Sequence, residues 1–129
     1  MTRTHEEVSD APRSERPEYT AISAAHDIEQ ALKFIDGRWK LLILFNLFGG
    51  QVLRFSDLER AIQGISQKML AQQLRQLEAD GIVQRMVHSQ VPPKVEYRPT
   101  TWGQSLCPAL DALLKWAERR SRPSPDVGA

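Results

Sequence analysis

The spacing of apolar residues predicts a mainly helical protein. Ile28, Leu32 and Ile35 follow one another at intervals of four and three residues, which is the spacing of an amphipathic helix. Residues 38–47 carry apolar side chains around most of a helical circumference, and such a helix must lie at the centre of a fold. We therefore expect two successive helices here, separated by the Asp36-Gly37 pair.

Capping residues predict where the next two helices begin and end. Ser56 and Glu59 have the spacing of a capping box, which predicts that a short helix starts at Ser56. Ser66 precedes a longer periodic stretch, and Gly81 follows it. We therefore expect a helix over residues 66–80, with Ser66 as its N-cap and Gly81 just beyond its C-terminus.

After Gly81 the pattern changes from helical to alternating. Residues 82–88 and 95–98 predict two short strands, and the Pro92-Pro93 pair predicts an irregular tip between them. A last helix then follows, capped by one of two consecutive threonines at 100 and 101. Five helical stretches and one hairpin in this order indicate a mainly α fold with a β-hairpin, the winged helix-turn-helix.

The helix over 66–80 carries the most chemical information. Leu70, Leu74 and Leu77 fall on one face, and a strip of amides and cations falls on the other. A recognition helix needs such groups because amides pair with adenine, and Arg or Lys with guanine, in the major groove. The alternative is an ordinary solvated face. The candidate base-reading residues are Gln67, Lys68, Gln72, Arg75 and Gln76.

Further cations and capping hydroxyls are candidates for contacts with DNA phosphates, which position a protein without reading sequence. Two of the cations lie in a helical first turn, where the helix dipole disfavours positive charge and a phosphate would compensate. Surface charge without a partner is the competing interpretation for each residue. The candidate phosphate contacts are Arg38, Lys40, Arg54, Ser56, Ser66, Arg85, Lys94 and Arg98.

The last helix carries two neighbouring apolar stripes, more than one helix needs to cover a core of this size. A two-fold dimer through the first and last helices would bury the surplus and set two recognition helices about 34 Å apart, one turn of DNA. The candidate dimer-interface residues are Ile28, Leu32, Leu106, Leu110, Leu113 and Trp116.

Length and charge are compatible with this interpretation. The chain has 129 residues, of which 41% are hydrophobic, so we expect one domain over 22–120 with disordered tails at 1–21 and 121–129. The net charge of +1 is unevenly divided. Residues 1–36 carry four basic and eight acidic side chains, a balance of −4, and the remainder carries 13 and eight, a balance of +5. A basic body permits a polyanionic partner.

Other chemistry finds little support. No apolar run is long enough to span a bilayer, so we expect no membrane partner and a cytoplasmic protein. The three histidines are scattered, and no catalytic constellation, phosphate loop or metal-ligand cluster is present, so we expect neither an enzyme nor a cofactor. Cys107, the single cysteine, excludes an intrachain disulfide. It is either a small buried hydrophobe or a redox-active thiol at a dimer interface.

Five segments together resemble the HxlR family of bacterial transcriptional regulators. They are residues 37–44 (GRWKLLIL), 54–58 (RFSDL), 64–70 (GISQKML), 74–81 (LRQLEADG) and 91–97 (VPPKVEY). The resemblance covers residues 26–116. It implies a dimeric winged helix-turn-helix protein with a recognition helix at 66–80, a Pro-Pro wing, and a dimer made by the first and last helices. Family members often carry a cysteine just before the first helix, where this chain has His26.

The sequence thus predicts a homodimeric, sequence-specific DNA-binding transcriptional regulator whose partners are an operator duplex and a second copy of the chain. The alternative is a winged-helix protein–protein interaction module that does not bind DNA. A small-molecule effector is compatible with the first interpretation, although no motif identifies one. The operator sequence, and whether the protein represses or activates, stay open at this stage.

Overall fold

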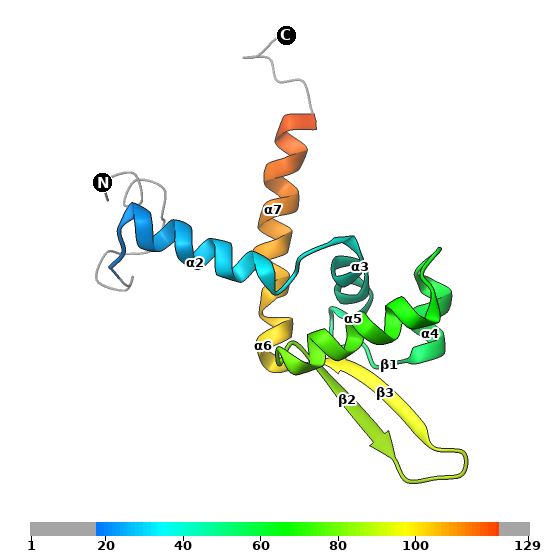
Figure 1. Ribbon diagram of the computed structural model, residues 1–129. Coiled ribbons are helices and arrows are strands. Elements are labelled where there is room, and N and C mark those ends of the chain that lie inside the picture. Colours follow the sequence, from blue (N-terminus) through cyan, green and yellow to red (C-terminus); the bar gives the residue numbers. More distant parts are fainter. Residues whose placement is uncertain (1–17, 122–129) are drawn as a thin grey trace. The chain divides into compact units, whose positions relative to one another are not determined.

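The structure is a computed structural model that describes residues 18–121. By its internal contacts the chain divides into two units, Met1–Asp36 and Gly37–Ala129. The first unit contains α2 (Ala21–Lys33). The second contains, in order, α3 (Arg38–Leu47), β1 (Leu53–Arg54), α4 (Phe55–Ala61), α5 (Gln67–Ala79), β2 (Val83–His88), β3 (Lys94–Pro99), α6 (Thr101–Gln104) and α7 (Leu106–Ser121) (Figure 1).

Helix α2 begins at a reciprocal cap between Thr20 and Ser23. The Thr20 hydroxyl accepts from the Ser23 amide at 3.1 Å, and the Ser23 hydroxyl accepts from the Thr20 amide at 2.9 Å. This pairing satisfies N–H groups that have no partner inside a helix. The predicted first helix is confirmed, although it ends at Lys33 and so excludes Ile35. Residues 1–17 and 122–129, which make up most of the predicted tails, lie outside the described part of the chain.

The core of the second unit lies between α3, α4, α5 and the start of β2. Helix α3 contributes Ile43, Leu44 and Leu47, all without exposed surface, which confirms the prediction of a central helix. The predicted leucine face of α5 packs against it and against β2. The largest fully buried side chains are Ile43, Leu44, Leu47, Leu58, Ile62, Leu70, Leu74, Leu77, Ile82 and Val83.

The sheet has three antiparallel strands in the order β1-β3-β2. The predicted hairpin is confirmed as β2 and β3, and it extends beyond the helices in Figure 1. Strand β1 was not predicted. It is only two residues long, too short for an alternating pattern, and it forms because Leu53 and Arg54 pair with Tyr97 and Glu96 of β3.

The start of α4 corrects the predicted cap at Ser56. The N-cap is Arg54, whose backbone N–H donates to the Asp57 carboxylate at 2.9 Å. Pairing with β3 keeps Arg54 extended, so α4 begins at Phe55. A cap at Ser56 would have started the helix two residues later, at Asp57. The Asp57 carboxylate is also a charge-assisted acceptor, which binds an amide more strongly than a hydroxyl does.

The predicted last helix is divided in two at Ser105, between α6 and α7. Thr100 is the N-cap, and its hydroxyl accepts from the Gly103 amide at 2.9 Å while donating to the Gly81 carbonyl at 2.6 Å. Gly103 lies against β2: a Cβ atom there would stand 2.0 Å from the carbonyl oxygen of Ile82. Glycine at 103 therefore allows α6 to approach the beginning of β2.

Among residues 18–121, no helix combines the length and the apolar character needed to cross a membrane.

Candidate DNA-binding surface

Helices α4 and α5 form a helix-turn-helix pair. Gly64 in the turn between them has a φ of +87°, a conformation that residues with a Cβ rarely adopt. Ser66 then caps α5 as predicted, because its hydroxyl accepts from the Met69 amide at 3.0 Å. Buried Ile65 and Leu70, on either side of Ser66, hold this end of the helix against the core.

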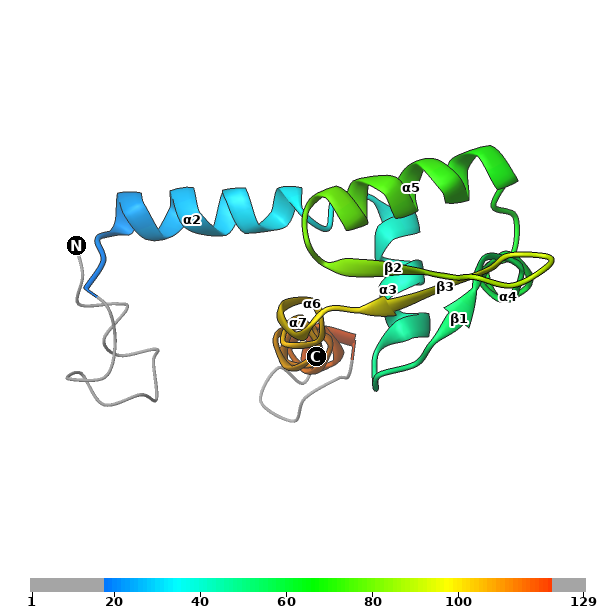
Figure 2. The same cartoon turned by 90° about the horizontal axis from the view of Figure 1, so that it is seen from below.

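The two faces of α5 have opposite environments. Leu70, Leu74 and Leu77 are at most 1% exposed, which confirms the predicted inward face. All five candidate base-reading side chains are exposed, and none makes a hydrogen bond or ion pair within residues 18–121. Gln73 behaves differently, since it is half-buried and its amide donates to the Met69 sulfur. The helix therefore presents unpaired amides and cations to solvent. Figure 2 shows α5 lying over β2.

The register of the hairpin separates its cations onto two faces. Side chains alternate along a strand, so Lys94 and Arg98 share one face of β3. Gln84 is the pairing partner of Arg98 and lies on that same face. Arg85 pairs with the buried Tyr97 and belongs to the opposite face, where its own side chain is nevertheless exposed.

One carboxylate links the polar groups near the hairpin tip. Glu96 is 2.7 Å from His88 Nε2 through Oε1 and 3.5 Å from Lys94 Nζ through Oε2. Partial burial raises the pKa of Glu96, but the hydrogen bond to His88 and the charge of Lys94 outweigh it, so the pKa lies below its ordinary value. The charge of Lys94 is thus partly balanced by Glu96.

The burial of Lys40 argues against its predicted role at a phosphate. It is 8% exposed, whereas Arg38 in the same first turn of α3 is exposed and lies 4.5 Å above the Trp39 ring. Lys40 precedes Ile43, Leu44 and Leu47 at spacings of three, four and seven, so it belongs to the inward stripe of the helix. That spacing was visible in the sequence and could have excluded Lys40.

The other predicted phosphate contacts lie at the surface. Arg54, Ser56 and Ser66 are exposed, although the hydroxyl of Ser66 is already the cap of α5. Arg98 is exposed and donates from Nε to the Gln84 side-chain oxygen at 3.0 Å.

Four of the six candidate dimer residues are exposed, and the other two, Leu106 and Leu110, are not. Leu113 and Trp116 on α7 are 50% and 70% exposed, and Leu114, which was not predicted, is 51% exposed. Leu110 is only 6% exposed, so most of its surface is already covered within its own chain. Leu106 is half-buried. On α2, Ile28 and Leu32 are 60% and 52% exposed.

The structure also bears on the single cysteine and on possible metal ligands. Cys107 is a free, half-buried cysteine at the start of α7. Within residues 18–121, no three His, Cys, Asp or Glu side chains gather in a way that could hold a metal ion.

Comparison with known proteins agrees with this arrangement. The family model described as HxlR-like helix-turn-helix matches residues 34–125. The HTH-type transcriptional regulator YtcD of Bacillus subtilis (strain 168) is 51% identical over 89 residues, which are 69% of this chain and 70% of that protein. A regulator of the same type from Methanothermobacter thermautotrophicus is 46% identical over 91 residues, 70% of this chain and 69% of the other.

Solved structures show the same fold. The crystal structure of ytcD matches with a TM-score of 0.68 and 49% identity, over 74% of this chain and 97% of the other. The redox regulator HypR in its reduced form matches with a TM-score of 0.68 and 42% identity, over 74% of this chain and 93% of the other. The matched family consists of transcriptional regulators, which are not enzymes. The family match over residues 34–125 and the similarity to these relatives show that this chain belongs to the HxlR-like helix-turn-helix family of transcriptional regulators.

Proposed function

We propose that this protein is a homodimeric, sequence-specific DNA-binding regulator, in which α5 enters the major groove and the β2–β3 hairpin lies along the backbone. The observation that carries the proposal is the outward face of α5, where amides and cations are exposed and have no partner within residues 18–121. Water satisfies the hydrogen bonds of such exposed groups, so they do not destabilise the fold. They become useful when base edges with matching donors and acceptors replace that water.

The base-reading role belongs to the residues that α5 turns outward. Lys68, Gln72 and Arg75 lie within one sector of the helix, opposite the buried leucines. Gln67 lies in the first turn, the part of a recognition helix that goes deepest into the groove, and Gln76 lies one turn after Gln72. An amide can pair in two bonds with adenine, and a guanidinium with guanine.

Phosphate contacts would surround this helix and fix its register on the duplex. A hairpin that lies edge-on to the backbone offers both of its faces, so Arg85 on one side and Lys94 and Arg98 on the other can each approach a phosphate. The exposed end of α3 and the start of α4 supply the rest. The residues that we propose for phosphate are Arg38, Arg54, Ser56, Ser66, Arg85, Lys94 and Arg98, without the buried Lys40.

The homodimer follows from apolar surface that one chain leaves exposed. Leu113, Leu114 and Trp116 stand close together in the sequence of α7 and are each at least half exposed. Ile28 and Leu32 add apolar surface on α2. A second copy that covers these residues would remove them from water and repeat the recognition helix across a two-fold axis. Because the proposed partner is operator DNA, we expect the protein to act in the cytoplasm.

Selection of bound sequences from randomised duplexes tests the proposal. We expect a single enriched motif with two-fold symmetry and half-sites about one DNA turn apart. A protein–protein interaction module would enrich no sequence, and a monomeric reader would enrich one half-site without symmetry.

Lys94→Ala provides a complementary test of the hairpin. Loss of one phosphate contact should weaken binding to cognate and random duplexes alike, and it should reduce the slope of log affinity against log salt by about one. Gel shifts at several salt concentrations measure both quantities. Lys115→Ala, which removes an exposed cation from α7, is the matched control and should leave the slope unchanged. An unchanged slope for Lys94→Ala would remove the hairpin from the DNA contact.

A further inference from the structure

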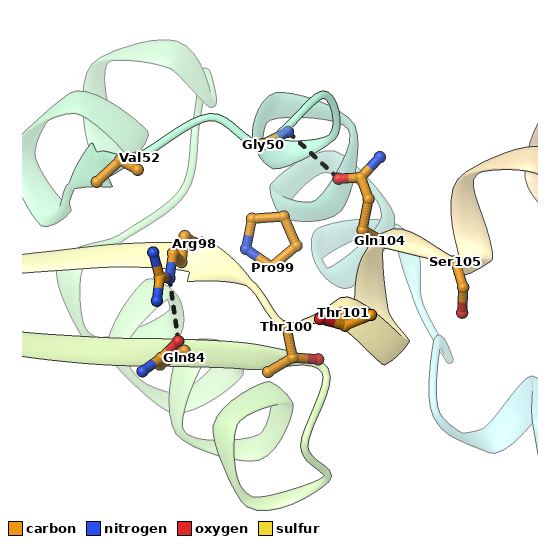
Figure 3. Close-up of a pocket in the computed structure, with 9 residues that line it drawn as sticks. All are labelled: Gly50, Val52, Gln84, Arg98, Pro99, Thr100, Thr101, Gln104 and Ser105. Atoms are coloured by element: carbon orange, nitrogen blue, oxygen red, sulfur yellow. Dashed lines mark hydrogen bonds between the residues drawn. The ribbon is translucent and has the colours of Figure 1, made fainter.

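A cavity of about 620 Å³ lies at the root of the β2–β3 hairpin. Its volume falls within the range of sites that hold small molecules, roughly 300–1,000 Å³. Three parts of the second unit form its walls: the segment between α3 and β1, the root of the hairpin, and α6 (Figure 3). The lining residues are Gly50, Val52, Gln84, Arg98, Pro99, Thr100, Thr101, Gln104 and Ser105.

The side chain of Gln104 is fixed with its donor group free. Its Oε1 accepts from the backbone amides of Gly49 and Gly50, at 3.1 and 3.3 Å (Figure 3). Two converging N–H groups can be satisfied only by an acceptor, so the oxygen and not the nitrogen must face them. The NH₂ group of Gln104 has no partner within residues 18–121 and remains as a donor.

Gln84 is fixed in the same way by Arg98. The Arg98 Nε–H donates to Gln84 Oε1 at 3.0 Å, and a guanidinium can only donate, so the oxygen of Gln84 must be the atom that faces it. This leaves the NH₂ group of Gln84 and both terminal nitrogens of Arg98 without a partner in the described part of the chain. Figure 3 shows Gln84 and Arg98 side by side on neighbouring strands.

The remaining lining sets the charge and shape of an occupant. Arg98 is the only charged residue among the lining residues, and no carboxylate lines the cavity. The hydroxyl of Thr100 is already engaged with Gly103, Gly81 and Ile82. Val52 and Pro99 provide apolar wall. The unused side-chain groups of both amides and the guanidinium are thus donors, and Arg98 supplies the positive charge.

We propose that this cavity binds a small organic carboxylate, with its oxygens on Arg98 and the Gln84 amide and its apolar body against Val52 and Pro99. A carboxylate has only acceptors, and it matches the planar fork of a guanidinium. Gln104 lines the cavity on the side of α6, and its NH₂ group suits a second polar group on the ligand. An occupant would contact both the hairpin root and α6, which continues into α7.

Binding is tested on the full chain without DNA, so the result does not depend on the proposed function. Benzoate and hexanoate serve as probes with a flat and a flexible body. Each is titrated at constant ionic strength into ¹⁵N-labelled protein and followed by amide NMR. We expect saturable shifts of the side-chain NH₂ signals of Gln84 and Gln104 and of the Gly50 amide. Benzamide, which has the shape of benzoate without its charge, should bind at least about ten-fold more weakly.

Two variants and a matched control locate the site. Arg98→Gln removes the charge, and Gln84→Glu places a carboxylate beside Arg98 that repels the probe. Each should weaken binding at least about ten-fold while the remaining amide spectrum stays that of the folded protein. Arg85→Gln, which removes a cation from the opposite face of the hairpin, should bind the probes as wild type does. Absence of saturation with both probes, equal binding of benzamide, or wild-type affinity in Arg98→Gln would each overturn the proposal.

Discussion

Glutamine side chains serve two different purposes in this molecule. Gln67 and Gln72 on α5 are exposed, and both ends of their amides are free to pair with a base edge. Gln84 and Gln104 have their oxygens engaged by Arg98 and by two backbone amides, so the group that each leaves wholly unused is its NH₂ donor. We therefore propose sequence reading for the first pair and anion binding for the second, according to which atom of each amide the fold already uses.

At the scale of single residues, helical faces could be predicted from the sequence, whereas long-range contacts could not. The inward leucines of α5 were predictable because helical spacing alone separates its two faces. Lys40 was misjudged because its charge was given more weight than its place on the inward stripe of α3. The free NH₂ group of Gln104 could not be predicted at all, since its contact with Gly49 joins residues more than fifty positions apart.

The lowered pKa of Glu96 makes a prediction about stability and pH. A carboxyl whose pKa is depressed by folding stabilises the native state above its unfolded pKa, and this contribution is lost as the pH falls through the folded value. The gap in unfolding free energy between wild type and Glu96→Gln should therefore be largest near neutral pH and shrink below the ordinary glutamate pKa of about 4.3.

Urea denaturation at several pH values measures this gap. Glu78→Gln on α5 changes an exposed carboxylate that makes no hydrogen bond or ion pair within residues 18–121, and it serves as the control. A gap for Glu96→Gln that stays constant from neutral to acid pH would show that the contacts with His88 and Lys94 contribute nothing to stability.

At the scale of elements, capping and pairing determine the boundaries. Ser66 and Gly81 marked the ends of α5 because both act within a few residues of the helix they limit. The start of α4 could not be read in this way, since the pairing of β1 with β3 decides it. The break at Ser105 was not predicted either, because the sequence around it contains no helix-stop signal as clear as Gly81.

Gly103→Ala tests the close approach of α6 to β2. Alanine has the higher helix propensity, by about 1 kcal/mol, so a substitution governed by propensity alone would stabilise the protein. The Cβ atom would instead meet the backbone oxygen of Ile82 at 2.0 Å, and backbone cannot yield as a flexible side chain does. We expect a loss of about 1–3 kcal/mol in unfolding free energy, measured by chemical denaturation.

A control for propensity is available on the neighbouring helix. Ala112→Gly changes an exposed position of α7 and should cost about 1 kcal/mol through propensity alone. Unchanged or increased stability of Gly103→Ala would mean that α6 does not lie against Ile82 as the structure has it.

At the scale of the whole molecule, the apolar surface of α7 predicts self-association. Leu113→Glu should convert a dimer into a monomer, because burial of an unpaired carboxylate at an apolar interface is strongly unfavourable. Sedimentation equilibrium measures the mass directly. In a monomeric protein the same exposed substitution would change stability by no more than about 0.5 kcal/mol and leave the mass unchanged.

Lys115→Glu introduces the same charge about 200° around the helix from Leu113 and is the control for that experiment. It should leave the mass at that of the wild type. A wild-type protein that sediments as a monomer, or a Leu113→Glu variant that still dimerises, would contradict the proposed interface. The fold class and the order of the main helices and the hairpin were predictable from the sequence, whereas the burial of Leu110 and the exposure of Leu114 on the proposed interface were not.

The most direct measurement of the central claim compares Gln67→Ala and Gln72→Ala on two duplexes, the selected sequence and a random one. We predict that each variant loses about 1–3 kcal/mol of binding free energy on the selected duplex and keeps its affinity for the random one. Gln51→Ala, an exposed glutamine outside α5, should change neither affinity. Equal losses on both duplexes would show that α5 does not read bases.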